Sequence, residues 1–218
     1  RVSPDSGTVR AKLKEARFGF DEVVSEVPRG GTDLAKIVLV SPSDGEPIVD
    51  WDRTNITVRP RHGWRTNTTY VVTLLPGLTD LRGNVRDSTT VLVFSTGDSI
   101  PRTRVIGSVF DWSKGTAAPR AYVEAHPVGD TVLTFPTKAD SAGRFMLPYL
   151  TPGSYVIRAI LDGNNNRHLD PREAWDTVHV ELRDAASVDL YTFQHDTILG
   201  PRISTVTVVD SLTLRLTF

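Results

Sequence analysis

The sequence contains no cysteine and only one methionine, Met146. Disulfide bonds and cysteine-ligated metal sites are therefore excluded, and a cysteine-free chain is compatible with either redox compartment. No apolar run approaches the roughly 20 residues that a membrane-spanning helix needs. Because 25 basic residues nearly balance 26 acidic ones, no basic stripe favours a polyanionic partner. We therefore expect no nucleic-acid partner and no membrane span in this segment.

Motifs of common catalytic sites are also missing. We find no Gly-x-Ser-x-Gly elbow and no glycine-rich loop of the phosphate-binding type. The five histidines do not share a zinc-like spacing, and we interpret them as surface residues: His62, His126, His168, His179 and His195. The sequence therefore predicts a protein that is not an enzyme.

What the chain does contain is alternation of apolar and polar residues. In "DTVHVELR", Val178, Val180 and Leu182 share one face, as half-buried strands require. Six further runs alternate in the same way: 36–40, 55–59, 69–75, 89–95, 104–110 and 120–126. The 16 glycines and 14 prolines separate these runs, and no amphipathic helix is evident. Many short strands with frequent turn signals predict an all-β chain built from β-sandwiches.

A break in the alternation divides the chain near residue 100. The stretch "STGDSIPRTR" follows one strand and precedes the next, and its glycine, serine and proline content is typical of an exposed linker. We therefore predict a first domain over residues 1–98, a linker over 99–103 and a second domain over 104–196.

The C-terminal stretch "VVDSLTLRLTF" resumes the alternation. Its pattern "TLRLTF" resembles "EARFGF" of residues 15–20, and an apolar strand that ends without a partner is an aggregation hazard. We therefore interpret residues 200–218 as the start of a further copy of the first domain.

The segment "LDGNNNRHLDPREAWD" interrupts the second domain with three consecutive asparagines. Numbered from Asp162, its polar positions one, three, five, seven, nine and twelve have the ligand spacing of an EF-hand calcium loop: Asp162, Asn164, Asn166, His168 (through its carbonyl), Asp170 and Glu173. Calcium is a hard cation that takes six to eight oxygen ligands. We predict a structural Ca²⁺, or another divalent ion, in this loop. Arg167 stands at position six, where glycine is usual, and an ordinary solvated turn is the alternative.

Two family resemblances follow from longer motifs. The stretches "ARFGFDEVV", "NTTYVVTLLPGLTDLRGN" and "VLVFSTG" resemble the SbsA-type bacterial Ig-like domain, over nearly all of residues 1–97. The stretch "DSAGRFMLPYLTPGSYVIR" resembles the carboxypeptidase-regulatory-like, or prealbumin-like, β-sandwich, over residues 103–193. The second resemblance implies a non-catalytic module. Tandem domains of these families belong to secreted or surface-anchored bacterial proteins, often lipoproteins of the outer membrane or periplasm.

Together these features predict two tandem β-sandwiches, Ig-like and then prealbumin-like, followed by the first strands of a further domain. The expected function is a structural or adhesive module of a bacterial cell-surface or secreted protein, whose partners are other domains of the same chain and a surface protein or glycan. One alternative is a carbohydrate-binding module that uses exposed tryptophans: Trp51, Trp64, Trp112 and Trp175 are the candidates. Another is an accessory domain of a secreted hydrolase.

Overall fold

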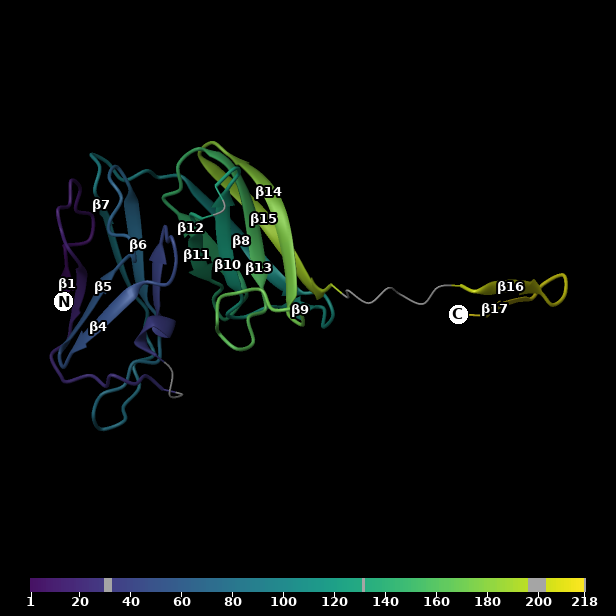
Figure 1. The fold of residues 1–218 in the computed structure, drawn as a ribbon, viewed down its shortest axis with the longest axis horizontal. Helices are drawn as coiled ribbons and strands as arrows, with labels where there is room; N and C mark the ends of the chain where they lie inside the picture. The colour runs from purple at the N-terminus through teal and green to yellow at the C-terminus, as the bar shows by residue number, and fades with distance from the viewer. Residues whose placement is uncertain (30–32, 131, 196–202, 218) are drawn as a thin grey trace.

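Strands account for every regular element of the described chain except one short 3₁₀ helix. The computed structural model describes residues 1–29, 33–130, 132–195 and 203–217. Within them the fold is all-β, as the alternation predicts, and the strands form two sandwiches followed by a separate hairpin (Figure 1). Among these residues no helix has the length and apolarity to cross a membrane.

The first sandwich packs a four-stranded sheet against a three-stranded one. The strand order of the first sheet is β1 (Val2–Ser3), β2 (Ala16–Gly19), β5 (Asn55–Arg59) and β4 (Ile48–Asp52). That of the second is β3 (Val38–Ser41), β6 (Thr69–Leu74) and β7 (Thr90–Ser95). Strand β6 buries alternate residues, Tyr70, Val72 and Leu74, in the core between the sheets.

The second sandwich has its own core between two sheets that share a corner. One sheet runs β11 (Phe135–Lys138), β10 (Tyr122–Pro127), β13 (Gly153–Ile160) and β14 (Ala174–Leu182). The other runs β15 (Ala185–Gln194), β8 (Arg104–Asp111) and β12 (Arg144–Pro148), and β9 (Thr116–Ala117) pairs with β8. Strands β14 and β15 pair only at Ala174–Gln194 and Trp175–Phe193, where one sheet turns into the other.

Strands β8 and β15, the first and last of the second sandwich, pair in parallel over eight residues. Their backbones approach so closely at Gly107 that a Cβ there would lie 1.8 Å from the carbonyl oxygen of Val188. Glycine is therefore required at this point for steric reasons.

Most strands lie where the alternation predicts them, but those predicted from residues 36 and 120 each begin two residues later, at Val38 and Tyr122. The predicted strand over 36–40 begins instead as the 3₁₀ helix η1 (Leu34–Ile37), and β3 starts only at Val38. The Asp33 side chain accepts a hydrogen bond from the N–H of Ala35 at 2.9 Å and caps this turn. The start of the predicted strand was therefore wrong by two residues, because a local cap wins over the apolar pattern.

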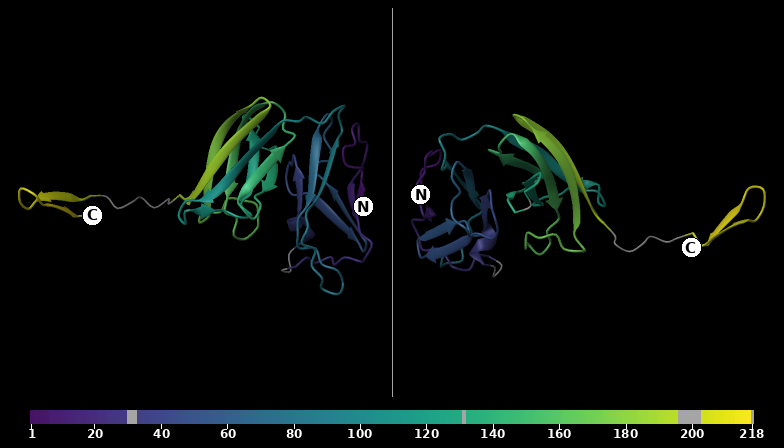
Figure 2. Two further views of the ribbon diagram at one scale, coloured as in Figure 1. Left: turned by 180° about the vertical axis from the view of Figure 1, so that it is seen from behind. Right: turned by 45° about the horizontal axis from the view of Figure 1, so that its top comes forward.

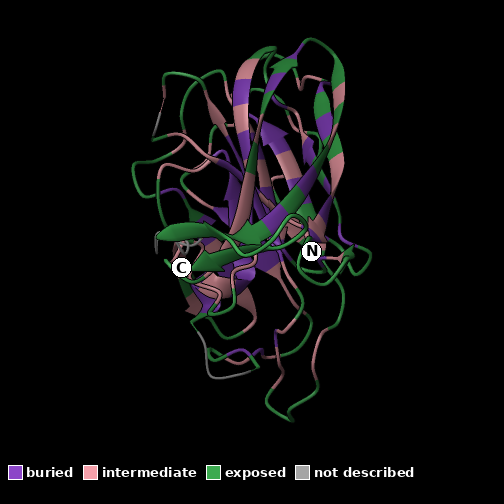
Figure 3. Cartoon of the chain, turned by 90° about the vertical axis from the view of Figure 1, so that its right-hand side faces the viewer, coloured by how far each residue is buried: buried purple, intermediate pink, exposed green. Residues whose placement is uncertain are grey.

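The C-terminal segment forms an isolated hairpin of β16 (Thr205–Val208) and β17 (Leu214–Thr217). The hairpin projects away from both sandwiches (Figures 1 and 2). All eight strand residues are exposed (Figure 3). Of the predicted segment 200–218, residues 200–202 and 218 lie outside the described residues. That the hairpin opens another copy of the first domain stays a prediction.

Candidate functional site

The loop between β13 and β14 ties the predicted calcium ligands into one hydrogen-bonded network. The two carboxylate oxygens of Asp162 accept backbone N–H bonds, from Asn166 at 3.0 Å and from Arg167 at 2.9 Å. The side-chain amides of Asn164 and Asn166 both donate to Oδ2 of Asp170, at 2.6 and 3.0 Å. Residues one, three, five and nine of the predicted loop are thus drawn together.

Glu173 closes the loop at its far end. Its two carboxylate oxygens accept the N–H groups of Gly163 at 2.9 Å and of Asp170 at 3.1 Å. His168 joins the network only through its backbone N–H, which donates to Oδ1 of Asn166 at 2.8 Å. The six predicted positions therefore belong to one curled segment, but at position seven the network uses the backbone N–H, whereas the predicted ligand is the carbonyl oxygen.

The curl depends on two residues in the left-handed region. Asn165 has φ +59° and Arg167 has φ +63°. Asparagine tolerates this conformation, whereas an arginine there is strained. Arg167 therefore stands at position six, where an EF-hand loop has glycine, and this position has a positive φ here.

The donor set contains only oxygen atoms, in carboxylates and amides. Oxygen ligands of this kind are the ones that a hard cation such as calcium prefers. Within the described ranges, no three histidine, aspartate or glutamate side chains form a metal-ligating group. Asp162, Asp170 and Glu173 instead accept hydrogen bonds from different N–H groups of the loop. A cation here therefore depends on the amide oxygens as well as on the carboxylates.

The same loop reaches across to the first sandwich. Nη2 of Arg167 donates to the carbonyl oxygens of Ala35 at 2.9 Å and Lys36 at 2.7 Å, both in η1. Burial lowers the pKa of the Arg167 guanidinium. Next to it, Lys138 of β11 donates to Oδ1 of Asn165, and burial lowers the pKa of the Lys138 ammonium as well. One arginine of the loop thus links the two sandwiches.

Two further contacts join the sandwiches. Ser43 and Thr134 exchange both backbone hydrogen bonds, at 2.7 and 2.8 Å, as a single antiparallel bridge. Leu39 of the first sandwich packs in one buried cluster with Tyr122 and Ile160 of the second. The domain junction, which we define as these contacts together with Arg167, combines main-chain pairing, apolar burial and charge-assisted hydrogen bonds.

A buried ionic cluster lies on the junction face of β10 and β13. Glu124 is only 4% exposed and accepts hydrogen bonds from Nε of Arg158, at 2.9 Å, and from its Nη2. Nε2 of His126 lies 3.2 Å from Oε1 of Glu124, close enough for an ion pair but without hydrogen-bond geometry. Burial alone would raise the pKa of Glu124, but its contacts with His126 and Arg158 lower that pKa below its usual value.

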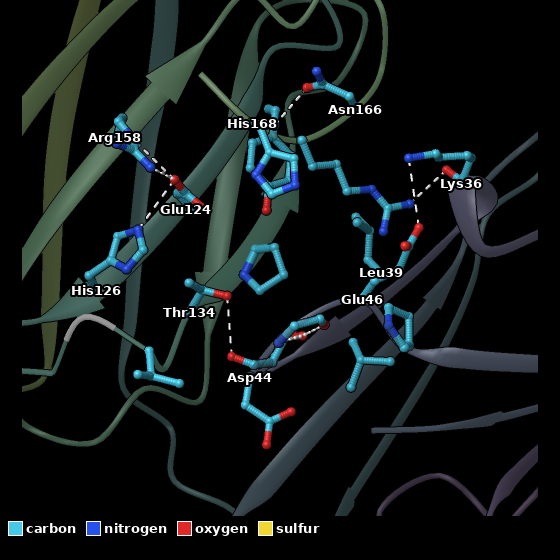
Figure 4. A pocket seen from close by; sticks show the side chains of 18 residues that line it. Lys36, Leu39, Asp44, Glu46, Glu124, His126, Thr134, Arg158, Asn166 and His168 are labelled. Atoms are coloured by element: carbon cyan, nitrogen blue, oxygen red, sulfur yellow. Dashed lines mark hydrogen bonds and ion pairs between the residues drawn. The ribbon is translucent and has the colours of Figure 1, made fainter. Parts of the chain in front are cut away.

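A cavity of about 380 Å³ opens between the sandwiches at this junction (Figure 4). Glu124, Arg158 and His168 line it from the second sandwich, and Lys36 and Asp44 line it from the first. Nδ1 of His62 lies 3.2 Å from Oδ2 of Asp44, and the other carboxylate oxygen of Asp44 is buried and has no hydrogen-bond partner among the described residues. The lining of the cavity therefore carries charges of both signs.

Sequence reasoning missed this cluster. We interpreted His126 as a surface residue, which is wrong, because its side chain is only 21% exposed at the junction. The signal in the sequence was weak: "YVEAHP" reads as a half-exposed strand, and only the presence of the first sandwich buries its polar face.

The four tryptophans do not form one platform. The indole N–H of Trp51 donates to Val24, and Trp64 packs edge-on against Tyr70. Both side chains therefore make their contacts within the first sandwich. Trp112, which is 67% exposed, and Trp175 lie on the second sandwich instead.

Comparison with known proteins adds the following. Residues 1–96 match the family model described as a bacterial Ig-like domain. No curated protein matches the chain.

Three solved structures have a similar arrangement of strands. The major pilin subunit BcpA of Bacillus cereus is 9% identical, with a TM-score of 0.32, and the match covers 89% of this chain and 69% of the pilin. The N-terminal part of the bacterial S-layer protein SbsC is 15% identical, with a TM-score of 0.31, over 83% of this chain and 43% of that structure. The 5-hydroxyisourate hydrolase of Klebsiella pneumoniae is 17% identical, with a TM-score of 0.29, over 43% of this chain and 94% of the enzyme.

The SbsA type of the first domain and the carboxypeptidase-regulatory-like family of the second stay predictions. Residues 1–96 are similar to a bacterial Ig-like domain.

Proposed function

We propose that this chain is a non-catalytic structural module of a bacterial cell-surface or secreted multidomain protein. In this proposal, calcium bound by the asparagine loop braces the junction between its two sandwiches. The observation that carries the proposal is the double hydrogen bond from Arg167 to the carbonyl oxygens of η1, because it joins the predicted ion site to the other domain.

The kinds of contact at the junction support a role in holding the two domains together. Domains that move independently meet through small polar contacts. Here the contact includes a main-chain bridge between Ser43 and Thr134 and the buried Leu39. A junction of this kind holds two domains in one orientation, which suits a spacer. The match of residues 1–96 to a bacterial Ig-like domain supports the bacterial origin.

Calcium binding is supported by the oxygen donors and by the hydrogen bonds that hold them. Loop N–H groups fix the orientation of Asp162 and Glu173 before any ion arrives, so little conformational entropy remains to be lost. In this proposal, the amide oxygens of Asn164 and Asn166 complete a ligand set that the three carboxylates do not form by themselves. Since Arg167 carries strain at position six, we expect weak affinity, on the order of 1 mM, as in extracellular calcium modules.

Arg167 connects the ion to the junction. Its backbone N–H donates to Asp162, the first ligand position, while its guanidinium donates to η1. Fixing Asp162 on an ion therefore fixes the backbone from which the guanidinium extends. We propose that calcium stiffens both the loop and the junction by this path.

The test is thermal unfolding of the 218-residue chain after chelation and after adding calcium. Calcium at about ten times its Kd stabilises by about 1.4 kcal/mol. For a chain of this size this gives a rise in Tm of about 3–5 °C. Asp162→Ala should abolish the rise, and magnesium should give a smaller one because it demands a stricter octahedral geometry.

Asp140→Ala is the matched control. Asp140 also accepts backbone N–H groups in a turn of the second sandwich, from Ala142 and Arg144, but lies outside the loop. This variant should lose basal stability and keep its full response to calcium. A wild-type Tm that does not respond to calcium would refute the proposed ion.

A second variant tests the coupling. Arg167→Ala should retain calcium binding by titration calorimetry, yet calcium should no longer protect the junction from limited proteolysis. Equal protection by calcium in the variant and the wild type would separate the ion from the junction and contradict the proposed path.

A further inference from the structure

Aromatic rings gather on the outer surface of the second sandwich, where β8, β15 and β14 meet. At one end of this group, Trp175 also packs against the cluster of Leu39, Tyr122 and Ile160 at the domain junction. We call this group the aromatic strip; it crosses the ends of β8, β15 and β14 near the exit of the chain (Figure 1). It consists of Phe110, Trp112, Trp175, Tyr191, Phe193 and His195.

The rings of the strip hold one another in place. Tyr191 stacks on Phe110 at a centroid distance of 5.2 Å and meets Trp112 edge-on at 5.9 Å. His195 lies between Trp175 and Phe193, at 4.1 and 4.0 Å. Such contacts restrict ring orientation before any ligand binds, so less entropy is lost on binding.

The strip is open to solvent. Trp112 is 67% exposed, Tyr191 44% and Phe193 42%. Neighbouring exposed rings of this size mark a binding surface more often than isolated apolar residues do. Toward the other end of the sheet, the polar pair Asp189 and Ser108 separates the strip from the aliphatic residues beyond it.

Hydrogen-bonding groups accompany the rings. In the described part of the chain, neither the indole N–H of Trp112 nor that of Trp175 has a hydrogen-bond partner, and the same holds for the Tyr191 hydroxyl. These donors lie at the ring edges, so a ligand that covers the ring faces can also hydrogen-bond at the rims.

Charge decides between ligand classes. Nucleic acid also stacks on aromatic rings, but its binding needs cationic side chains along the path. Lys114 is the cation near Trp112 in sequence, and its ammonium is paired with Asp111 at 2.7 Å. Asp176 beside the strip accepts the backbone N–H of Tyr191 and adds negative charge. A neutral ligand therefore fits better than a polyanion.

From this geometry we infer that the aromatic strip binds neutral polysaccharide through pyranose rings stacked on Trp112 and Tyr191. A pyranose presents C–H groups on its flat faces and hydroxyl groups around its rim, which matches apolar ring faces edged by free donors. This binding function goes beyond the proposed structural role and does not depend on calcium.

The test is affinity electrophoresis of the 218-residue chain in native gels that contain hydroxyethyl cellulose, galactomannan or glycol chitin. We expect at least one of these polymers to retard the wild type. Trp112→Ala and Tyr191→Ala should each weaken the apparent affinity about fivefold, since one aromatic contact contributes about 1 kcal/mol. Tryptophan emission should also shift on binding in the wild type and less in Trp112→Ala.

Met146→Ala is the matched control, because Met146 is 51% exposed on β12 of the same sheet but lies outside the strip. It should bind as the wild type does. No retardation of the wild type by any of the three polymers, or equal retardation of wild type and Trp112→Ala, would overturn the inference.

Sedimentation velocity separates glycan binding from self-association. If the wild type dimerises through the strip, Trp112→Ala should restore a monomer, and that result without glycan retardation would reassign the surface to a protein contact. A monomeric wild type that the polymers retard supports the inference.

Discussion

The two outer faces of the second sandwich differ in exposure and in residue type. The covered face carries charged residues, whereas the face open to solvent carries aromatic ones. The face of β10 and β13 is covered by the first sandwich, yet it carries the ion pair of Glu124 and Arg158. The face of β8 and β15 is open to solvent, yet it carries Trp112 and Tyr191. Residue polarity along a strand therefore does not tell which face another domain covers.

This contrast follows from two kinds of stabilisation. On the covered face, a buried carboxylate is stable only because two partners satisfy it. On the open face, exposed apolar rings are explained either by ligand binding or by packing against one another. Four predictions test this difference: three measure the effect of a substitution, and one compares a substitution with the wild type across a range of pH.

The largest effect is expected on the covered face. Arg158→Ala removes the main partner of Glu124 and leaves a buried charge, which should lower the free energy of unfolding by about 3 kcal/mol. Since the Arg158 side chain is 32% exposed, we expect the lower end of the range for buried pairs. Urea unfolding at pH 7 measures the loss.

Arg144→Ala serves as the control for this prediction. Arg144 pairs with Asp140 at 3.0 Å, but its side chain is 72% exposed, so its loss should cost less than about 1 kcal/mol. Equal costs for the two arginines would show that the junction does not bury the pair.

The second effect concerns the sheet under the open face. Gly107→Ala should destabilise by about 1–3 kcal/mol, because the added methyl group would lie 1.8 Å from the carbonyl of Val188 and 2.8 Å from the Phe145 ring. Gly163→Ala is the control, since no atom lies within 4 Å of its Cβ position. Both are measured by urea unfolding in the presence of chelator.

The third effect is the acid response of the covered face. The pKa of Glu124 lies below its ordinary value of 4.5, so the folded state favours its ionised form. Its contribution to stability is present above about pH 4.5 and is lost as the pH falls through the lowered pKa. The wild type should therefore lose more stability than Glu124→Gln between pH 5 and pH 3, as the difference between two series of urea midpoints. Parallel series would contradict this assignment.

The smallest effect is expected on the open face. Trp112→Ala should change the free energy of unfolding by no more than about 0.5 kcal/mol, because the side chain is 67% exposed. Thermal unfolding and circular dichroism measure this. A large loss would mean that the strip stabilises the sandwich, and Trp112 would then be a packing residue.

The sequence predicts the strands well because their signal is local. Asn55–Arg59 forms β5 with the predicted bounds, and Val180 and Leu182 of the run "DTVHVELR" are both buried. Each such strand needs only its own side chains and one apolar layer to bury them. The all-β fold is confirmed for this reason.

The contacts between domains could not be predicted in the same way. His126 and Glu124 alternate with apolar residues as they would on a solvent-facing strand, but in the fold they line the cavity at the junction with the first sandwich. The asparagine loop is intermediate. Its spacing predicts Asp162 and Asp170 as calcium ligands, which stays a prediction, and nothing in the spacing indicates that Arg167 reaches η1.

The parallel pairing of β8 with β15 has a mechanical consequence. The chain enters the second sandwich at Arg104 and leaves it at Gln194, and these strands lie side by side in the same direction over eight residue pairs. Tension applied through the two ends pulls the strands past each other along their length, so the hydrogen bonds between them are loaded in shear and must break together. Rupture under force then depends on the unfolding rate of this whole ladder, since no terminal strand can peel away one bond at a time.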